Sequence, residues 1–303
     1  MQSSAEHLRS WEIPELARFE ETPGGLVRLV VTTARASAEI YLNGAHVTQF
    51  QPTGEAPVLF MSQASLLQPG KAIRGGVPVI FPWFGGRAGH PESPAHGFAR
   101  TSAWEVESLT ASADGPAVIS LVLTANEQTR GQWSHEFLIR HRITVDRELT
   151  MVLEVENLGT APFEFEEALH TYLSVSDVRE TATTGLAGIE YIDKVDGLRR
   201  KVQEAAPIRI TGETDRVYLN TKGTCSADDP GLGRRLEVAK EGSDTTVVWN
   251  PWIAKAAAMA DFGNDEWPQM LCIETANAAE NAVTLAPGAR HAMTAIVRVA
   301  PRG

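Results

Sequence analysis

Residues 136–157 read EFLIRHRITVDRELTMVLEVEN and are the stretch that decides the fold class. Two segments rich in Val, Ile, Leu and Thr, residues 136–145 and 148–157, lie on either side of a polar Asp-Arg pair, which is the pattern of successive strands. Segments of the same kind recur at residues 26–33, 38–50 with an Asn43-Gly44 turn, 118–125, 163–175, 207–211, 245–249, 270–275 and 292–299. Strands therefore dominate the whole chain.

Helical patterns are scarce between these strands. Residues 3–19 predict at most a short helix interrupted near Pro14, and residues 250–261 contain an Ala-rich turn after Pro251. Strands that follow one another without alternating helices disfavour a parallel βαβ sheet. We therefore predict an all-β fold in which antiparallel sheets pack as a sandwich.

Composition excludes several classes of function. The 303 residues carry 27 Lys and Arg against 38 Asp and Glu, a formal net charge of −11, which argues against broad contact with nucleic acid or an anionic membrane. No run approaches the ~18 apolar residues of a membrane span, and the first ten residues show no secretory signal. The two cysteines lack a C-x-x-C spacing, so a cytoplasmic location is expected.

A loop-rich segment stands out at residues 70–96, which are dense in Gly and Pro. Arg74 precedes two glycines there, and His96 and Arg100 follow a short distance later. Glycines let the backbone come close to a ligand, and a guanidinium can form two hydrogen bonds with phosphate or carboxylate oxygens, so the two arginines could clamp a small anion. The alternative is that each arginine pairs with one of the many acidic side chains.

The segment PFEFEEALHTYL at residues 162–173 alternates between apolar and polar residues. A regular strand would place Phe163, Phe165, Leu169 and Leu173 on one face and Glu164, Glu166, His170 and Tyr172 on the other. The face with His170 is either ordinary solvent-exposed sheet or the wall of a cleft. Glu166 would lie about 13 Å along the strand from His170, too far for direct contact unless the strand bends.

Glu274 is a lone carboxylate in the apolar segment MLCIETA at residues 270–276. An ionised acid in such surroundings is costly unless it is paired or opens into a polar site. Glu274 therefore either meets a structural arginine or acts as a base.

Two aromatic clusters, at residues 81–84 and 249–252, suit sugar rings or simply the core. No cluster of His, Cys and acidic residues has the spacing of metal ligands, and the nucleotide, dinucleotide and α/β-hydrolase motifs are missing from the sequence.

Six motifs taken in order resemble the glucose-6-phosphate 1-epimerase family, the hexose-6-phosphate mutarotases of the aldose 1-epimerase superfamily. They are KAIRGGVPVIFPWFG at residues 71–85, HGFAR at 96–100, ALHTY at 168–172, ETDRVY at 213–218, VWNPW at 248–252 and CIETA at 272–276. The resemblance spans about residues 25–300. It implies a large antiparallel β-sandwich of the galactose mutarotase-like type, with residues 25–303 as a single domain and residues 1–24 as an N-terminal segment packed on or flanking it.

The resemblance also implies roles for single residues. His170 matches the family's catalytic histidine and Glu274 its catalytic glutamate, while Arg74 and Arg100 match the arginines that bind the sugar phosphate. Asp215 matches a substrate-binding aspartate.

The resemblance also places His96 in a motif of the family's site, so His96 is expected near the sugar. Some members have Gln just before that histidine, whereas this chain has Ala95, so that contact is lost or replaced.

The implied activity is cofactor-free interconversion of the α and β anomers of a hexose 6-phosphate by a protein expected to be monomeric. The alternatives are an aldose 1-epimerase that acts on unphosphorylated sugars and a carbohydrate-binding sandwich without turnover. A glycoside hydrolase is disfavoured because it usually needs two carboxylates, and only Glu274 stands out as a buried acid.

Overall fold

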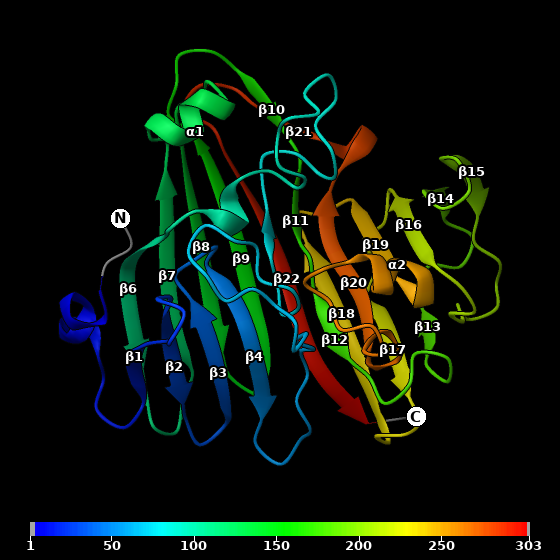
Figure 1. Cartoon of the computed structure of the whole chain (residues 1–303), viewed down its shortest axis with the longest axis horizontal. Helices are drawn as coiled ribbons and strands as arrows, with labels where there is room; N and C mark the ends of the chain where they lie inside the picture. Colours follow the sequence, from blue (N-terminus) through cyan, green and yellow to red (C-terminus); the bar gives the residue numbers. More distant parts are fainter. Residues whose placement is uncertain (1–3, 302–303) are drawn as a thin grey trace.

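The computed structural model describes residues 4–301, in which one long antiparallel sheet runs through the molecule and forms one layer (Figure 1). In spatial order its strands are β13 (Ala182–Thr184), β17 (Cys225–Asp229), β18 (Arg234–Glu241), β22 (Arg290–Pro301), β9 (Glu148–Asn157), β8 (Phe137–Val145), β7 (Ala117–Thr124) and β6 (Glu105–Ala111). Every second residue of β8 and β9 is buried, so their apolar period of two places one face on the core.

The second layer consists of two antiparallel sheets. One is formed by β1 (Ala17–Glu21), β2 (Val27–Thr32), β3 (Ala36–Tyr41) and β4 (His46–Pro52). The other contains, in order, β15 (Arg199–Val202), β14 (Glu190–Asp193), β16 (Thr214–Leu219), β19 (Thr245–Asn250), β20 (Met270–Asn277), β11 (Glu167–Leu169) and β5 (Val79–Ile80), with β12 (Tyr172–Ser174) also paired to β20. The two sheets are joined where the Val77 N–H donates to the Val47 carbonyl at 2.8 Å.

Short helices and one small ribbon complete the described chain. The helices are η1 (Ala5–Trp11), η2 (Ala99–Thr101), α1 (Glu127–Gln132), α2 (Trp252–Ala258), η3 (Trp267–Gln269) and η4 (Ala279–Asn281), and the ribbon pairs β10 (Phe163–Phe165) with β21 (Val283–Leu285). None of these helices is long and apolar enough to cross a membrane.

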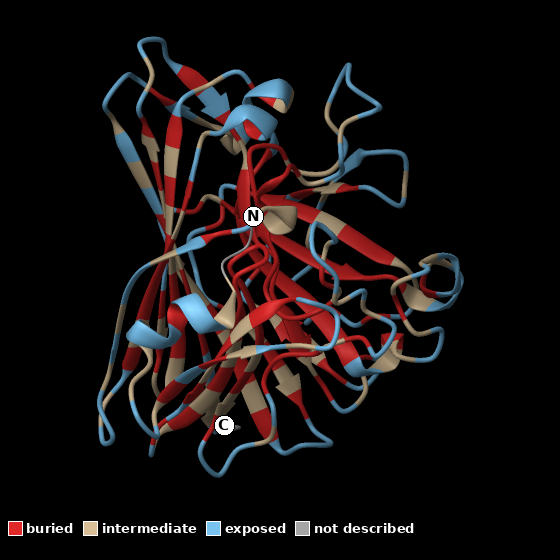
Figure 2. Ribbon diagram, turned by 60° about the vertical axis from the view of Figure 1, so that its left-hand side comes forward, coloured by how far each residue is buried: buried red, intermediate tan, exposed pale blue. Residues whose placement is uncertain are grey.

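The core lies between the layers, where Figure 2 shows buried strand segments, with the exposed residues concentrated in the loops around them. Leu29, Ile139, Leu153 and Val248 belong to one continuous apolar cluster and are each fully buried. Burial of a side chain of this size contributes about 1.5–3 kcal/mol relative to exposure. The all-β sandwich predicted from the sequence is confirmed.

Two strand predictions were wrong. Residues 207–211 form only an isolated bridge, between Ile208 and Thr183. The alternating segment 163–175 is not one strand, because it breaks at Glu166 and again after Leu169 to give β10, β11 and β12. At the second break the Thr171 N–H turns back and donates to the Leu169 carbonyl at 2.9 Å, whereas the His170 N–H keeps the register of β11 with β5 and donates to the Pro78 carbonyl at 3.0 Å. The turn at Thr171 therefore interrupts the single strand that the alternation predicts.

Candidate active site

A cavity of about 290 Å³ opens over the sheet that contains β20, and all six residues singled out from the sequence line it. Those six are Arg74, His96, Arg100, His170, Asp215 and Glu274, and the remaining lining residues are Phe84, Ala95, Lys194, Trp249, Lys255 and Met259. Residues from three strands, two short helices and several loops thus meet at one place.

Strand register brings His170 and Glu274 together. Leu169 of β11 pairs with Thr275 of β20, and Tyr172 of β12 pairs with Cys272 of β20. His170, between β11 and β12, therefore lies opposite Glu274, and the two side chains are on the same face of the sheet. The two side chains approach to 3.3 Å between His170 Nε2 and Glu274 Oε1. Both are buried, and neither His170 Nδ1 nor Glu274 Oε2 has a hydrogen-bond partner among the described residues.

Burial perturbs both members of this pair. Loss of water raises the pKa of Glu274 well above its ordinary value, and the negative charge of Asp215 adds to the shift. Loss of water also lowers the pKa of His170 well below its ordinary value, with the positive charges of the neighbouring arginines acting in the same direction. Between these two shifted pKa values the pair therefore shares one proton, and the two groups titrate together.

His96 lies beside His170, with their ring centroids 5.8 Å apart. The Gly85 N–H donates to His96 Nδ1 at 3.2 Å, so the neutral ring carries its proton on Nε2. Burial and the charge of Arg100 lower the pKa of His96 well below its ordinary value. His96 is thus a neutral hydrogen-bond donor at the cavity wall.

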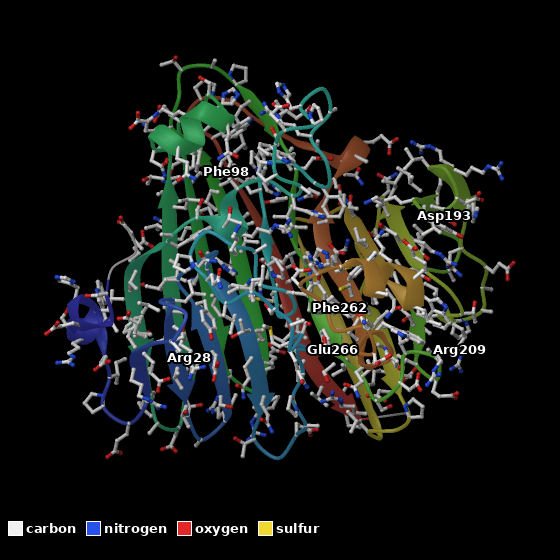
Figure 3. All side chains as sticks on the ribbon, in the orientation of Figure 1. Arg28, Phe98, Asp193, Arg209, Phe262 and Glu266 are labelled. Atoms are coloured by element: carbon white, nitrogen blue, oxygen red, sulfur yellow. The ribbon has the colours of Figure 1, made fainter. Side chains whose placement is uncertain are left out.

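Arg74 is held by two neighbours. Its Nε and Nη2 donate to Asp261 Oδ2 at 3.2 and 3.0 Å, and its Nη1 donates to the Tyr172 hydroxyl at 3.0 Å. Burial disfavours the charge, but Tyr172 and Asp261 outweigh it and raise the pKa of Arg74. Asp261 in turn lies in the segment that contains Phe262 and Glu266, both labelled in Figure 3. Glu266 holds this segment in place by accepting from Ser62 Oγ at 2.6 Å.

Arg100 is different because it has no carboxylate partner within residues 4–301. Its Nη2 donates to the Ala95 carbonyl at 2.8 Å, and its Nε is buried without any hydrogen bond. Burial and the charge of Arg74 lower the pKa of Arg100 to about 10, so the guanidinium stays charged at neutral pH. A desolvated cation without a counter-ion indicates a binding site for an anion.

The rest of the cavity wall contains acids, lysines and an aromatic ring. Asp215 pairs in register with Trp249, so both side chains lie on the face that carries Glu274. Lys194 Nζ lies 3.4 Å from Asp215 Oδ2, and Lys255 Nζ lies 3.0 Å from Glu213 Oε1. Among the residues described, no group of His, Cys, Asp and Glu could hold a metal ion.

Comparison with known proteins places the chain in a family. The family model described as aldose 1-epimerase matches residues 28–298. The chain belongs to the aldose 1-epimerase family. A relative from Cenchrus ciliaris, named "Putative glucose-6-phosphate 1-epimerase", is 36% identical over 90% of this chain and 84% of that protein. A protein of the same name from Escherichia coli (strain K12) is also 36% identical, over 90% of both chains.

Solved structures agree with this membership. A structure described as a "putative mutarotase" from Salmonella typhimurium has a TM-score of 0.90 at 29% identity and covers 96% of each chain. Galactose 1-epimerase from Lactobacillus acidophilus NCFM, with a TM-score of 0.73 and 12% identity over 95% of this chain and 99% of that one, shares the fold. As a member of the aldose 1-epimerase family, this protein is an isomerase of the epimerase or mutarotase class.

Some site residues of this aldose 1-epimerase family member were not predicted from the sequence. Lys194 and Lys255 stand in a turn and a short helix with nothing in their local sequence to mark them. Tyr172 shares the predicted polar face with His170, and that shared face was the available sign of its contact with the site.

Two sequence interpretations also need correction. Glu274 is not the only buried acid, because Glu167 is equally buried and lies 2.9 Å from His291 Nε2, away from the cavity. The glycines after Arg74 permit close approach of protein backbone rather than of a ligand, since a Cβ on Gly76 would collide with the Val47 carbonyl.

Proposed function

We propose that this protein interconverts the α and β anomers of hexose 6-phosphates, with D-glucose 6-phosphate as the first substrate to test. The observation that carries the proposal is Arg100, a charged and largely desolvated guanidinium without a carboxylate partner in the cavity that also holds His170 and Glu274. An unphosphorylated sugar would leave that charge uncompensated, whereas a phosphate dianion would neutralise it.

The two arginines would then have different roles in binding the phosphate. Arg74 is oriented by Tyr172 and Asp261 and supplies a fixed donor, while Arg100 supplies the uncompensated charge. Hydrogen bonds between charged partners contribute about 1.5–3 kcal/mol each, which corresponds to roughly a 10- to 100-fold gain in affinity. This short-range recognition suits a protein whose net charge of −11 would repel a dianion at long range.

Ring opening would need one base and one acid. The reacting form of the pair has its shared proton on His170. The Glu274 carboxylate takes the proton from the anomeric hydroxyl, the C1–O5 bond breaks as C1 becomes an aldehyde, and the His170 imidazolium donates its proton to O5. Because the pKa of Glu274 is raised and that of His170 is lowered, the carboxylate is a stronger base and the imidazolium a stronger acid than in water. Rotation about C1–C2 and reversal of the proton transfers close the ring as the other anomer.

The remaining cavity residues would orient the sugar. Asp215 offers carboxylate oxygens to sugar hydroxyls, and His96 offers its Nε2 proton. The Trp249 ring lines the same cavity and stands at 83° to the His170 ring, 5.9 Å away between centroids. A flat apolar face beside polar groups is the usual surface against which a pyranose ring packs.

Anomer exchange measured by NMR saturation transfer on glucose 6-phosphate and on free glucose tests this proposal. We expect a clear preference for the phosphorylated sugar, and in Arg100→Leu a KM for glucose 6-phosphate about 10- to 100-fold higher with little change on free glucose. Lys71→Gln is the matched control, because it removes a positive charge at an exposed position outside the cavity, in the loop before β5 that also carries Arg74.

Three results would each contradict a different part of the proposal. Equal wild-type activity on both sugars would make the protein an aldose 1-epimerase for unphosphorylated substrates. Equal losses on both sugars in Arg100→Leu would make Arg100 a structural residue. Exchange at the wild-type rate in Glu274→Gln would remove the assigned base. Cytoplasmic location and a monomeric state stay predictions from the sequence.

A further inference from the structure

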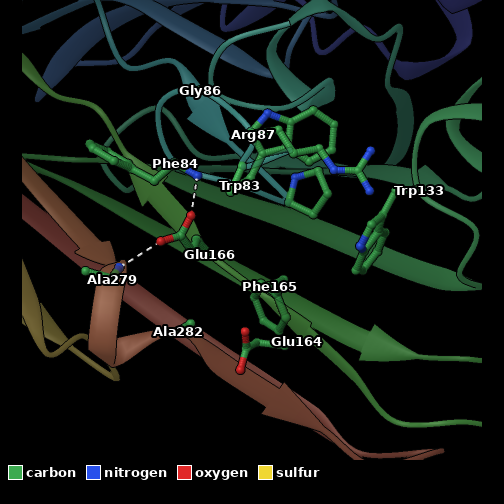
Figure 4. Close-up of a pocket in the computed structure, with 12 residues that line it drawn as sticks. Trp83, Phe84, Gly86, Arg87, Trp133, Glu164, Phe165, Glu166, Ala279 and Ala282 are labelled. Carbon is green, nitrogen blue, oxygen red and sulfur yellow. Dashed lines mark hydrogen bonds between the residues drawn. The ribbon is translucent and has the colours of Figure 1, made fainter. Parts of the chain in front are cut away.

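Glu166 connects three segments that build the active site without lining the cavity itself. Its Oε2 accepts the Phe84 N–H at 2.7 Å, and its Oε1 accepts the Ala279 N–H at 2.7 Å (Figure 4). Its own N–H donates to the Pro82 carbonyl at 2.9 Å. The carboxylate therefore ties the chain just before β11 to the loop after β5 and to the helix η4 that follows β20.

Neither oxygen of Glu166 contacts a cation within residues 4–301, so the carboxylate serves two backbone donors and nothing else. One of those donors, Ala279, has a φ of +56°, a strained conformation for a residue with a side chain. Hydrogen bonds from backbone N–H groups to a carboxylate are charge-assisted and well suited to fixing a loop.

The fixed loop in turn fixes His96. Phe84 is followed by Gly85, whose N–H donates to His96 Nδ1 at 3.2 Å and whose carbonyl accepts the His96 N–H at 2.7 Å. The Phe84 ring also lies against the His96 ring at 5.0 Å between centroids. Both hydrogen bonds that orient His96 among the described residues therefore come from Gly85, the residue next to the Glu166 anchor at Phe84.

We propose that Glu166 is a positioning residue that holds His96 in the tautomer with its proton on Nε2, acting through the backbone of Phe84 and Gly85. If the loop moved away, Nδ1 would lose its donor and the ring could take the other tautomer. The cavity wall would then present a hydrogen-bond acceptor in place of a donor. The sugar contact of His96 rests on the proposed function, but the tautomer does not.

Two-bond ¹H–¹⁵N correlation spectra of the histidine rings test the tautomer directly at pH 8 in the full-length protein. The His96 signals are assigned by their absence in His96→Gln. We expect wild type to show His96 only with the proton on Nε2, and Glu166→Ala to show a mixture of the two tautomers. Glu166→Gln keeps one acceptor oxygen but turns an amide toward the other N–H, so an intermediate mixture is expected.

Glu164→Gln is the matched control, because Glu164 lies two residues earlier, is exposed and makes no hydrogen bond or ion pair with the described residues. Figure 4 shows its side chain directed away from the loop. On the preferred sugar, Glu166→Ala should lower kcat about 10- to 100-fold, by analogy with the outer contacts that orient metal-bound histidines, while Glu164→Gln matches wild type.

A single Nε2-protonated tautomer in folded Glu166→Ala, or a proton on Nδ1 in wild type, would overturn the proposal. Thermal melting checks that each variant is folded, and Glu166→Gln keeps the test available if Glu166→Ala does not fold. Should wild type fail to exchange the anomers of any hexose phosphate, the proposed function fails while the spectra still decide the role of Glu166.

Discussion

His170 Nε2 lies 3.3 Å from Glu274 Oε1 because the two residues occupy opposite positions of paired strands, at the one point where the ladder between them is broken. At this break the Thr171 N–H turns back to the Leu169 carbonyl, while the His170 N–H still donates to Pro78 in register with β5 and the His170 side chain stays on the face that carries Glu274. A sheet normally satisfies its backbone and buries apolar side chains at such a position. Here it buries an acid and a base instead.

Replacement of Glu274 by Gln should separate activity from stability. Anomer exchange should fall by about 10²–10⁴-fold, the usual contribution of a general base. Because the folded-state pKa of Glu274 is raised, ionisation opposes folding, and wild type should lose stability relative to Glu274→Gln as the pH rises above the ordinary glutamate range. Melting temperatures of both proteins from pH 4 to 8 check this, and a variant less stable than wild type at pH 8 would contradict it.

The dependence of kcat/KM on pH should be bell-shaped, with both limbs belonging to the pair. Addition of a second proton puts a charge on buried His170, which burial opposes, so the acid limb should lie below the ordinary histidine pKa of about 6.5. Loss of the shared proton leaves a buried carboxylate, so the alkaline limb should lie well above the ordinary glutamate value. An acid limb centred above pH 7 on a substrate whose own ionisation is accounted for would refute this assignment.

The sequence was sufficient to predict the fold class because β8 and β9 bury every second residue. Apolar residues with a period of two can be recognised in a sequence without any tertiary information. Strands such as β13, β15 and β17 were missed because they are short and partly polar and are held by their neighbours in the sheet. The strand predicted at residues 207–211 does not form, because Ile208 and Ile210 are buried but have no continuous partner strand.

The candidate site was predicted as a set of residues but not as a geometry. Motif order singled out Arg74, Arg100, His170 and Glu274, yet whether an arginine pairs with an acid is decided by tertiary contact. The structure gives opposite answers for the two arginines, because Asp261 reaches Arg74 from the segment after α2 and no acid reaches Arg100 within residues 4–301. No local pattern carries that difference.

The buried pair of His291 and Glu167 should make stability depend on pH away from the site. Burial disfavours the imidazolium, but the hydrogen bond and charge of Glu167 outweigh it and raise the pKa of His291. This contribution is therefore fully present below about pH 6.5, the unfolded value, and is lost as the pH rises through the raised folded value. Urea unfolding of wild type and His291→Gln should show a difference that shrinks between pH 6 and 9, with equal kcat in both proteins at pH 6; a constant difference would count against the pair.

Removal of the Tyr172 hydroxyl should affect phosphate binding more than chemistry. Tyr172→Phe keeps the ring stacked on His170, at 4.7 Å between centroids, but removes the acceptor for Arg74 Nη1. A hydrogen bond of this kind contributes about 1.5–3 kcal/mol, so KM for a hexose 6-phosphate should rise by roughly tenfold while kcat changes little. Steady-state kinetics on phosphorylated and free sugar check this, and an equal change on both would show that the hydroxyl serves the sugar or the fold instead.

Gly97 should tolerate no side chain, although it is only one residue from His96. Its φ of +68° disfavours any L-residue, and a Cβ would collide with the Phe81 carbonyl, which accepts the Phe98 N–H at 3.0 Å. Relief of that collision requires Phe81, directly after β5, and the His96 loop to separate, so Gly97→Ala should lower the free energy of unfolding by at least about 2 kcal/mol. Gly86→Ala, in the same loop region with open space around its Cβ, should leave stability unchanged. Urea unfolding distinguishes the two variants, and similar stabilities would mean that the loop moves aside at little cost, in which case His96 is less firmly placed than its contacts with Gly85 indicate.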